Sequence, residues 1–354
     1  MPSWRVSGIL GRMDSPLKRH GANPVLTADD VPYHATLVFN AGVAKFAGRY
    51  VMIFRNDYGR WGDTRFDGTN LGLATSDDGV AWQVAPEPCI TLETARRLAA
   101  PFFAPRDVDQ EVKRFYDPRL TVIDGRLFMC FAIDTAHGIL GGIAVTDDLA
   151  TFEVLSISVP DNRNMVLFPE RLGGRYVRLE RPMPVYSRRG RDTFDVWLGA
   201  SPDLRCWGGH RLVLGVEDLP YANDKIGPAA PPVRTDRGWL TTLHGVDRDE
   251  SRGKHGWEPR WTKRYVAGLA LLDLNDPSRV LAVARQPLLA PEAGYETGEG
   301  ATPETDGFRN NVIFPGGMIL ENDGEVKIYY GAADTTECLA TAHVDDLVRF
   351  CLQG

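Results

Sequence analysis

The chain has 354 residues, of which 43% are hydrophobic and 25% are charged, a composition typical of soluble globular proteins. Its formal net charge of −7 argues against non-specific nucleic-acid binding, which requires a dense basic surface. No stretch approaches the roughly 20 apolar residues of a membrane-spanning helix, and the first residues lack the apolar core of a signal peptide. Five scattered cysteines without a Cys-x-x-Cys pair indicate reduced thiols. We therefore expect a cytoplasmic protein with no nucleic-acid or membrane partner.

A short glycine-containing turn followed by an alternating, apolar-rich strand occurs five times along the chain. Each strand ends on a polar or charged residue. A pattern repeated at intervals of tens of residues is typical of stacked or radial repeat architectures. If the five strands point inward, their terminal side chains converge on one axis. The five segments are 46–57, 124–134, 173–181, 237–244 and 323–334, ending at Asp57, Asp134, Arg181, His244 and Asp334.

A second repeat consists of turns in which a small polar residue precedes aspartate, directly after a further apolar strand. Such turns suit aspartate and serine, whose side chains bond nearby backbone N–H groups. The spacing of about 55–73 residues is long enough for one four-stranded antiparallel blade. These turns lie at 76–79, 146–149 and 201–204, with weaker versions at 272–274 and 344–347.

The pattern predicts an all-β fold, a single five-bladed β-propeller over residues 1–354. One short helix is expected between Thr91 and Ala100, ended by Pro101. The segment from Glu292 to Gly307 is rich in Gly, Glu and Thr, and we expect a mobile surface loop there. Whether this segment acts as an active-site lid is left open.

Asp117 is the first candidate for chemistry. It precedes Pro118, which restricts its backbone to extended conformations, and Arg119 follows two residues later on the same face of the expected strand. A carboxylate so placed in a cleft can act as a general acid. The alternative is a turn aspartate beside a surface arginine.

Four basic residues are candidates for ligand binding. Arg163 lies between two asparagines with no apolar pattern to explain it, and Arg181 ends a strand directly before a proline. Lys225 lies in a Gly/Pro-rich, restricted segment, and His244 ends a strand, where a lone histidine is more often structural. The remaining histidines show no metal-ligand spacing, so we expect no metal site.

Taken together, these segments resemble glycoside hydrolase family 130, the β-mannoside phosphorylases and their hydrolytic relatives. The resemblance runs from about Asn23 to Asp346 and implies a five-bladed propeller, in agreement with the repeats. The segments that carry it are 23–26, 39–42, 54–57, 116–119, 162–170, 181–182, 225–227, 231–246 and 329–335.

The resemblance also implies roles for single residues. Asp117 corresponds to the general acid, which in this family is thought to act through a sugar hydroxyl. The positions that hold phosphate are Arg163, Arg181, Lys225 and His244, and those expected to contact the substrate are Asn56, Asp57, Arg119 and Asp334.

The basic set distinguishes two reactions. An inverting hydrolase needs an acid and a base that activates water. Phosphate is already an anionic nucleophile, so a phosphorylase needs cations that hold it in line with the anomeric carbon. Because all four positions are basic, phosphorolysis is favoured over hydrolysis.

The sequence thus predicts an inverting phosphorylase that cleaves β-mannosides with inorganic phosphate and releases α-D-mannose 1-phosphate. β-1,4-linked mannosyl-glucose or manno-oligosaccharides are the expected substrates, and no cofactor is expected. A β-mannoside hydrolase of the same fold and a non-catalytic carbohydrate-binding propeller are the alternatives. Segments 96–113 and 297–305 match no familiar pattern, which leaves acceptor and linkage open. A homo-oligomer with Trp4, Trp257 or Trp261 at a subunit contact is also left open.

Overall fold

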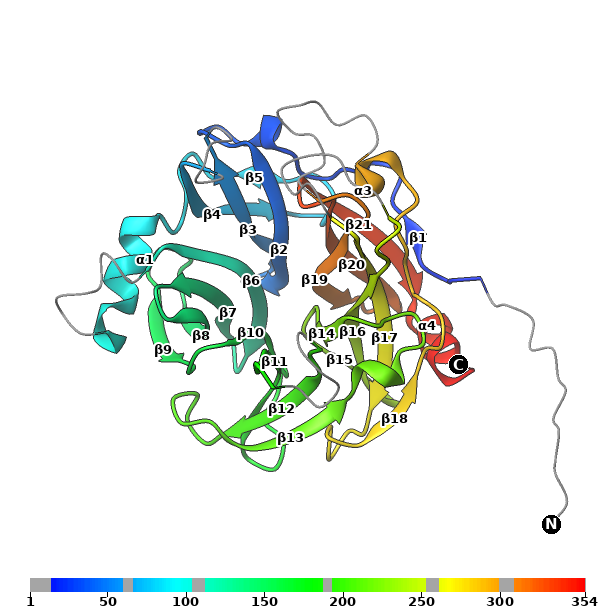
Figure 1. Cartoon of the computed structure of the whole chain (residues 1–354). Coiled ribbons are helices and arrows are strands. Elements are labelled where there is room, and N and C mark those ends of the chain that lie inside the picture. Colours follow the sequence, from blue (N-terminus) through cyan, green and yellow to red (C-terminus); the bar gives the residue numbers. More distant parts are fainter. Residues whose placement is uncertain are drawn as a thin grey trace, which may run out of the picture.

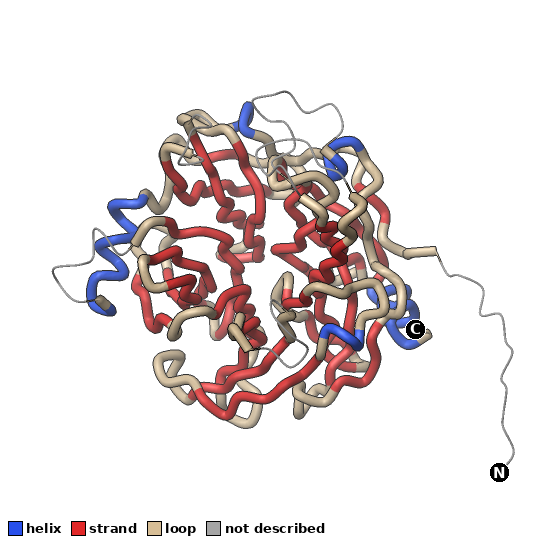
Figure 2. Tube along the Cα trace, in the orientation of Figure 1, coloured by secondary structure: helices blue, strands red, loops and turns tan. Residues whose placement is uncertain are grey.

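The computed structural model describes residues 14–59, 66–103, 112–186, 193–252, 261–298 and 309–353. Five antiparallel sheets surround a central axis in this part of the chain (Figure 1). Strands make up most of the ring, and the few helices lie at its periphery (Figure 2). The predicted five-bladed β-propeller is therefore confirmed. The predicted single domain, residues 1–354, also includes segments outside the described residues.

Each blade is one sheet whose first strand lies nearest the axis. Blade 1 contains β2 (Leu37–Phe46), β3 (Arg49–Tyr58), β4 (Gly68–Ser76) and β5 (Gln83–Val84). Blade 2 contains β6 (Arg114–Ile123), β7 (Arg126–Thr135), β8 (Gly138–Thr146) and β9 (Glu153–Ile157). Blade 3 contains β10 (Asn162–Leu167), β11 (Tyr176–Pro182), β12 (Val196–Ser201) and β13 (Gly208–Leu214). Blade 4 contains β14 (Lys225–Pro228), β15 (Val233–Thr235), β16 (Gly238–Arg248), β17 (Lys263–Leu272) and β18 (Val280–Val283). Blade 5 contains β19 (Ile313–Leu320), β20 (Glu325–Ala332), β21 (Thr336–His343) and β1 (Lys18–Arg19).

The ring is closed by a strand from the start of the chain. β1 pairs with β21, with Lys18 opposite Thr341 and Arg19 opposite Ala340, so blade 5 combines N-terminal and C-terminal segments (Figure 1). The segment at 344–347, expected as a turn, instead begins the helix α4 (Val344–Leu352). Because β1 already supplies the outer strand of blade 5, the chain needs no turn at this point.

The other four aspartate turns are confirmed. In each, the aspartate Oδ1 atom accepts hydrogen bonds from two backbone N–H groups two and three residues later, at 2.7–3.0 Å. In a turn between two strands, some backbone N–H groups have no partner in the sheet. The aspartate carboxylate accepts hydrogen bonds from these groups in place of water. The four residues are Asp78, Asp148, Asp203 and Asp273.

Helices occur only as short connecting elements in the described part of the chain. α1 (Leu92–Ala99) confirms the expected helix, and the Thr91 side chain caps it by accepting a hydrogen bond from the Thr94 N–H. The remaining elements are α3 (Gly294–Thr297), η1 (Ala28–Asp30), η2 (Ala100–Phe102) and η3 (Val216–Asp218).

The segment 292–307, expected as a surface loop, starts at the exposed Glu292 but contains a buried residue. Glu296 of α3 is fully buried and receives hydrogen bonds from Arg19 of β1 and from the Tyr330 hydroxyl. This part of the segment therefore anchors α3 and β1 to blade 5. Residues 299–307 lie outside the described residues.

Hydrophobic layers between adjacent blades hold the ring together. Five clusters of buried apolar side chains each join two neighbouring blades. Between blades 3 and 4, for example, the Phe168 and Trp239 rings meet edge to face with centroids 5.2 Å apart. This packing fixes the positions of the inner strands β2, β6, β10, β14 and β19.

No helix in the described ranges is long and apolar enough to cross a membrane. All five cysteines are free thiols.

Candidate active site

The inner strands of three successive blades carry the same β-bulge. In β2, β6 and β10, two residues lie opposite a single residue of the neighbouring strand. The first residue of each bulge has a left-handed backbone, with φ of 52° at Asn40, 53° at Asp117 and 56° at Asn164. Asn and Asp are the non-glycine residues that adopt this conformation most readily. The bulges therefore explain why an amide or a carboxylate stands at each of these positions. The extended backbone expected at Asp117 is wrong, because the bulge in β6 requires a left-handed conformation there.

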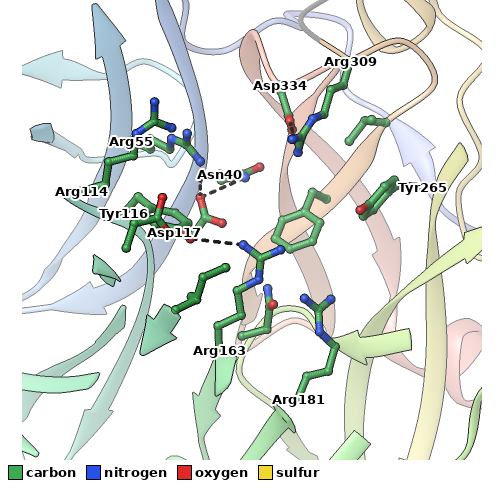
Figure 3. Close-up of a pocket in the computed structure, with 15 residues that line it drawn as sticks. Asn40, Arg55, Arg114, Tyr116, Asp117, Arg163, Arg181, Tyr265, Arg309 and Asp334 are labelled. Atoms are coloured by element: carbon green, nitrogen blue, oxygen red, sulfur yellow. Dashed lines mark hydrogen bonds and ion pairs between the residues drawn. The ribbon is translucent and has the colours of Figure 1, made fainter. Parts of the chain in front are cut away.

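A pocket of about 280 Å³ opens where the three bulges meet near the axis (Figure 3). Bulges redirect side chains, and here they bring the three polar groups to one cavity. Five arginines and three aspartates line it, so its wall carries an excess of positive charge. The lining residues are Asn40, Arg55, Arg114, Tyr116, Asp117, Asp134, Ile139, Arg163, Asn164, Arg181, Tyr265, Arg309, Val312, Phe314 and Asp334.

Asp117 is held at the pocket wall by neighbouring donors. Its Oδ1 atom accepts hydrogen bonds from Asn40 Nδ2 at 3.1 Å and from Arg55 Nη1 at 3.3 Å, and 12% of its side chain is exposed. Burial alone would raise the pKa of Asp117, but the guanidinium groups of Arg55, Arg119 and Arg163 outweigh it and hold the pKa below its ordinary value. The predicted catalytic carboxylate is thus an ionised, oriented group facing the cavity.

Asp57 lies behind the pocket wall instead of facing a sugar. Its carboxylate is fully buried, bonds Arg55 Nε at 3.0 Å and Nη2 at 2.7 Å, and accepts the Thr69 hydroxyl at 2.6 Å. This arrangement fixes the Arg55 guanidinium, which in turn bonds Asp117. Asp57 therefore supports Arg55 in this structure, and its expected contact with the substrate stays a prediction.

Asn56 and Arg119 are also buried outside the pocket lining. Asn56 donates from Nδ2 to the His34 carbonyl at 3.0 Å and to Asn70 Oδ1 at 3.1 Å. Arg119 donates to the Ala229 carbonyl at 2.7 Å and braces the bulge through the carbonyls of Asn40 and Pro118. Neither residue lines the pocket in this structure, and their expected contact with the substrate stays a prediction. The bulge in β6 directly precedes Arg119 and changes the face that its side chain takes.

Asp334 does line the pocket, as predicted. It follows β20, has a φ of 52°, and lies 3.4 Å from Arg309 Nη1 on the wall opposite Asp117 (Figure 3).

Arg163 and Arg181 lie side by side in the pocket because they are register partners across β10 and β11. Arg163 Nη1 donates to the Tyr116 hydroxyl at 3.2 Å, and that hydroxyl donates to Asp134 at 2.6 Å. Asp134, for which the sequence suggested no function, therefore orients Arg163 through Tyr116.

Arg181 is a buried cation without a counter-ion. No carboxylate in the described part of the chain lies within ion-pair distance, and its Nε atom has no hydrogen-bond partner there. Burial and the nearby charge of Arg163 lower the pKa of Arg181 to about 9. A desolvated guanidinium facing a cavity is an arrangement that an anionic ligand would stabilise.

His244 lies behind Arg181 and outside the pocket lining. Its Nε2 atom accepts a hydrogen bond from Arg181 Nη1 at 2.8 Å, so the imidazole is neutral with its proton on Nδ1. Burial and the charges of Arg181 and its neighbours hold the pKa of His244 well below its ordinary value. Gly227 permits this packing, since a Cβ there would lie 2.4 Å from the ring. His244 thus positions Arg181 in this structure, and its expected contact with phosphate stays a prediction.

Lys225 faces an adjoining cavity of about 360 Å³, which shares Arg163, Tyr265 and Arg309 with the first pocket. Burial and the charge of Arg181 lower the pKa of Lys225 to about 8. Of the four predicted phosphate residues, the structure thus brings Arg163 and Arg181 into the pocket and places Lys225 next to Arg163.

Several residues of the pocket were not predicted from the sequence. Asn40 and Asn164 could have been, because they occupy the same position as Asp117 in the bulge of an inner strand. The three bulged segments are Phe39–Gly42, Tyr116–Arg119 and Arg163–Val166. Tyr265 and Arg309 reach the site from blade 4 and from the segment before β19, where no repeat marks them.

The fold and the site together define a five-bladed propeller with one oriented carboxylate and an excess of arginines around a central pocket. A family model described as β-1,4-mannooligosaccharide phosphorylase matches residues 15–353. The chain therefore belongs to glycoside hydrolase family 130.

Individual relatives support this assignment. A Ruminococcus albus β-1,4-mannooligosaccharide phosphorylase is 30% identical over 94% of this chain and 90% of its own length. A Listeria innocua β-1,2-mannobiose phosphorylase is 34% identical over 62% of this chain, an alignment that spans 55% of the Listeria protein. A solved structure of β-1,2-mannobiose phosphorylase from Listeria innocua with β-1,2-mannobiose superposes with a TM-score of 0.74 and 25% identity, covering 95% of this chain and 99% of that one.

Proposed function

We propose that the protein is an inverting β-mannoside phosphorylase that transfers a mannosyl group from a β-mannoside to inorganic phosphate and releases α-D-mannose 1-phosphate. The observation that carries this proposal is the buried Arg181 without a counter-ion, next to Arg163, in the pocket that contains Asp117. A neutral sugar cannot balance the charge of two adjacent, buried guanidinium groups. A phosphate dianion supplies the charge and the acceptor oxygens that they lack.

The proposed reaction breaks the bond between the anomeric carbon and the glycosidic oxygen and forms a bond between that carbon and a phosphate oxygen. Arg163 and Arg181 hold phosphate on one side of the mannosyl ring, and Asp117 lies on a different wall of the same pocket. By family resemblance, Asp117 passes a proton to a sugar hydroxyl, whose own proton goes to the leaving oxygen. No cofactor is required, because phosphate is the nucleophile.

An acid must carry a proton, and three surrounding arginines hold the pKa of Asp117 low when no substrate is bound. A bound phosphate dianion offsets the charge of Arg163, and a bound sugar displaces water from the pocket. Both changes raise the pKa of Asp117. Asp117 thus becomes a competent acid only when both substrates are present.

Hydrolysis would require a second carboxylate free to activate water. The two other aspartates that line the pocket are engaged, Asp134 with the Tyr116 hydroxyl and Asp334 with Arg309. The pocket is therefore better suited to phosphate than to an activated water.

The reverse reaction tests the proposal and identifies the acceptor. α-D-mannose 1-phosphate is offered with glucose, mannose and β-1,4- or β-1,2-linked mannobiose, and phosphate release and product linkage are measured. We expect phosphate release with at least one acceptor and a product with a new β-1,4 bond. Because one relative is named for a β-1,2-linked substrate, products with a β-1,2 bond are measured as well. Failure of every acceptor to release phosphate would contradict the proposal.

The affinity for phosphate should fall as pH rises through about 8. Lys225 has a pKa of about 8, set by burial, by the nearby charges of Arg181 and Arg163, and by the opposing effect of Asp224. Below this pH Lys225 is protonated and attracts phosphate, and above it the charge is lost. KM for phosphate measured between pH 6.5 and 9.5 should rise on the alkaline side, while KM for the mannoside changes little. A flat KM for phosphate over this range would show that Lys225 does not contribute its charge.

A cytoplasmic location and a homo-oligomeric state remain predictions. Trp261 does not serve a subunit contact, because it is buried and stacks on Tyr265 beside the site with centroids 5.9 Å apart. Trp4 and Trp257 lie outside the described residues.

A further inference from the structure

The cavity next to the main pocket contains charged residues that the proposed mechanism does not yet use. Beyond the residues it shares with the pocket, its lining contains three cations, Lys225, Arg248 and Lys263, together with Glu250, Trp261 and Thr262. All three cations lie close to a single buried carboxylate, that of Asp224, which is 6% exposed.

One carboxylate oxygen of Asp224 pairs with Arg248, and the other pairs with the two lysines. Its Oδ1 atom lies 2.8 Å from Arg248 Nη2, and its Oδ2 atom lies 3.1 Å from Lys263 Nζ and 3.5 Å from Lys225 Nζ. One carboxylate therefore faces three positive groups, an excess of two charges when all are protonated. Burial and the charge of Lys225 lower the pKa of Lys263, as expected for two ammonium groups that share one counter-ion.

The register of blade 4 places Lys263 next to the phosphate candidates. Lys225 of β14, Val246 of β16 and Tyr265 of β17 form one cross-strand row. Lys263 precedes Tyr265 by two residues, so both side chains are on the same face of the sheet and their Cα atoms are about 7 Å apart along the strand. Lys263 therefore lies close to Lys225 in the lining of the second cavity, and 20% of its side chain is exposed.

We propose that Lys263 is a further phosphate-binding residue, which shares Asp224 with Lys225 in this structure and donates to phosphate when phosphate is bound. The excess of two positive charges around Asp224 matches a phosphate dianion, and the cavity joins the main pocket at Arg163 and Tyr265. Because Asp224 keeps Arg248 and one ammonium group, Lys263 can change partner without leaving this carboxylate unpaired. This inference rests on the proposed phosphorolytic function.

The test compares Lys263→Met with Lys263→Arg in the full-length protein. Met keeps most of the aliphatic length without the charge, and Arg restores the charge. We expect Lys263→Met to raise KM for phosphate about 10- to 100-fold, the loss of one charge-assisted hydrogen bond, with KM for the mannoside within about twofold of wild type. Lys263→Arg should recover most of the phosphate affinity. Lys18→Met removes one exposed charge from the outer edge of blade 5 and serves as the matched control.

A second measurement does not depend on turnover. Inorganic phosphate should raise the melting temperature of the wild-type and Lys18→Met proteins, and it should raise that of Lys263→Met clearly less at the same concentration. An unchanged KM for phosphate and an unchanged phosphate-induced shift in Lys263→Met would overturn the inference. If phosphate stabilises the wild type more than Lys263→Met but no mannoside is turned over, the proposed function fails while the role of Lys263 in phosphate binding stands.

Discussion

Replacing Asp117 with Asn should lower kcat of phosphorolysis by about 10²- to 10⁴-fold, the range that a positioned general acid contributes. Asn cannot supply the proton, yet it suits the backbone at this position, where φ is 53°. Its amide oxygen can still accept from Asn40 and Arg55, so the bulge of β6 should persist. The free energy of unfolding should therefore stay close to that of wild type.

The matched control for this prediction is Asp124→Asn. Asp124 also has a left-handed backbone, with φ of 51°, but it lies in the exposed turn before β7 with 72% of its side chain accessible. The same chemical change there should leave kcat unchanged. Activity in Asp117→Asn above one tenth of the wild-type value, with a normal melting temperature, would remove Asp117 from the role of acid.

Replacing Arg181 with Met should stabilise the phosphate-free protein and impair its use of phosphate. The mutation removes a buried cation that has no carboxylate partner, so we expect the free energy of unfolding to rise by about 1 kcal/mol. It also removes charge-assisted hydrogen bonds to phosphate of about 1.5–3 kcal/mol, so KM for phosphate should rise about 10- to 100-fold. Opposite effects on stability and function are expected where a charge is held unpaired for a ligand.

Arg178→Met provides the contrasting measurement from the same strand. Arg178 is also buried in β11, but its Nη2 atom lies 2.7 Å from the Glu180 carboxylate. Removing one member of a buried pair should destabilise the protein by about 3–5 kcal/mol. Denaturant unfolding without phosphate should therefore place Arg181→Met above wild type and Arg178→Met below it. Equal destabilisation of both variants would show that Arg181 is a structural residue.

The propeller could be predicted from the sequence because its repeats are local. Each glycine turn and each aspartate turn lies within one hairpin, and their fivefold recurrence defines the blades. Closure of the ring could not be predicted in the same way. β1 pairs with β21 across more than 300 residues, and a two-residue strand such as Lys18–Arg19 carries no periodic signal. The helix at Val344–Leu352 follows from that closure.

The lining of the pocket could be predicted from the sequence in part. The polar strand ends at Asp134, Arg181 and Asp334 line the pocket, but Asp57 and His244 lie one layer behind it. Alternation along a strand indicates which face a side chain takes but not its distance from the axis, and a bulge changes the alternation of its own strand, as it does before Arg119 in β6. The sequence positions of Asn40, Asp117 and Asn164 contained the bulge signal, since Asn and Asp recur where the backbone must be left-handed.

The most direct test of phosphorolysis is the product formed from a β-mannoside with and without inorganic phosphate, followed by ³¹P and ¹H NMR. We expect α-D-mannose 1-phosphate as the first product in phosphate buffer and no cleavage in phosphate-free buffer. Release of free mannose at the same rate in both buffers would contradict the account and identify the protein as a hydrolase.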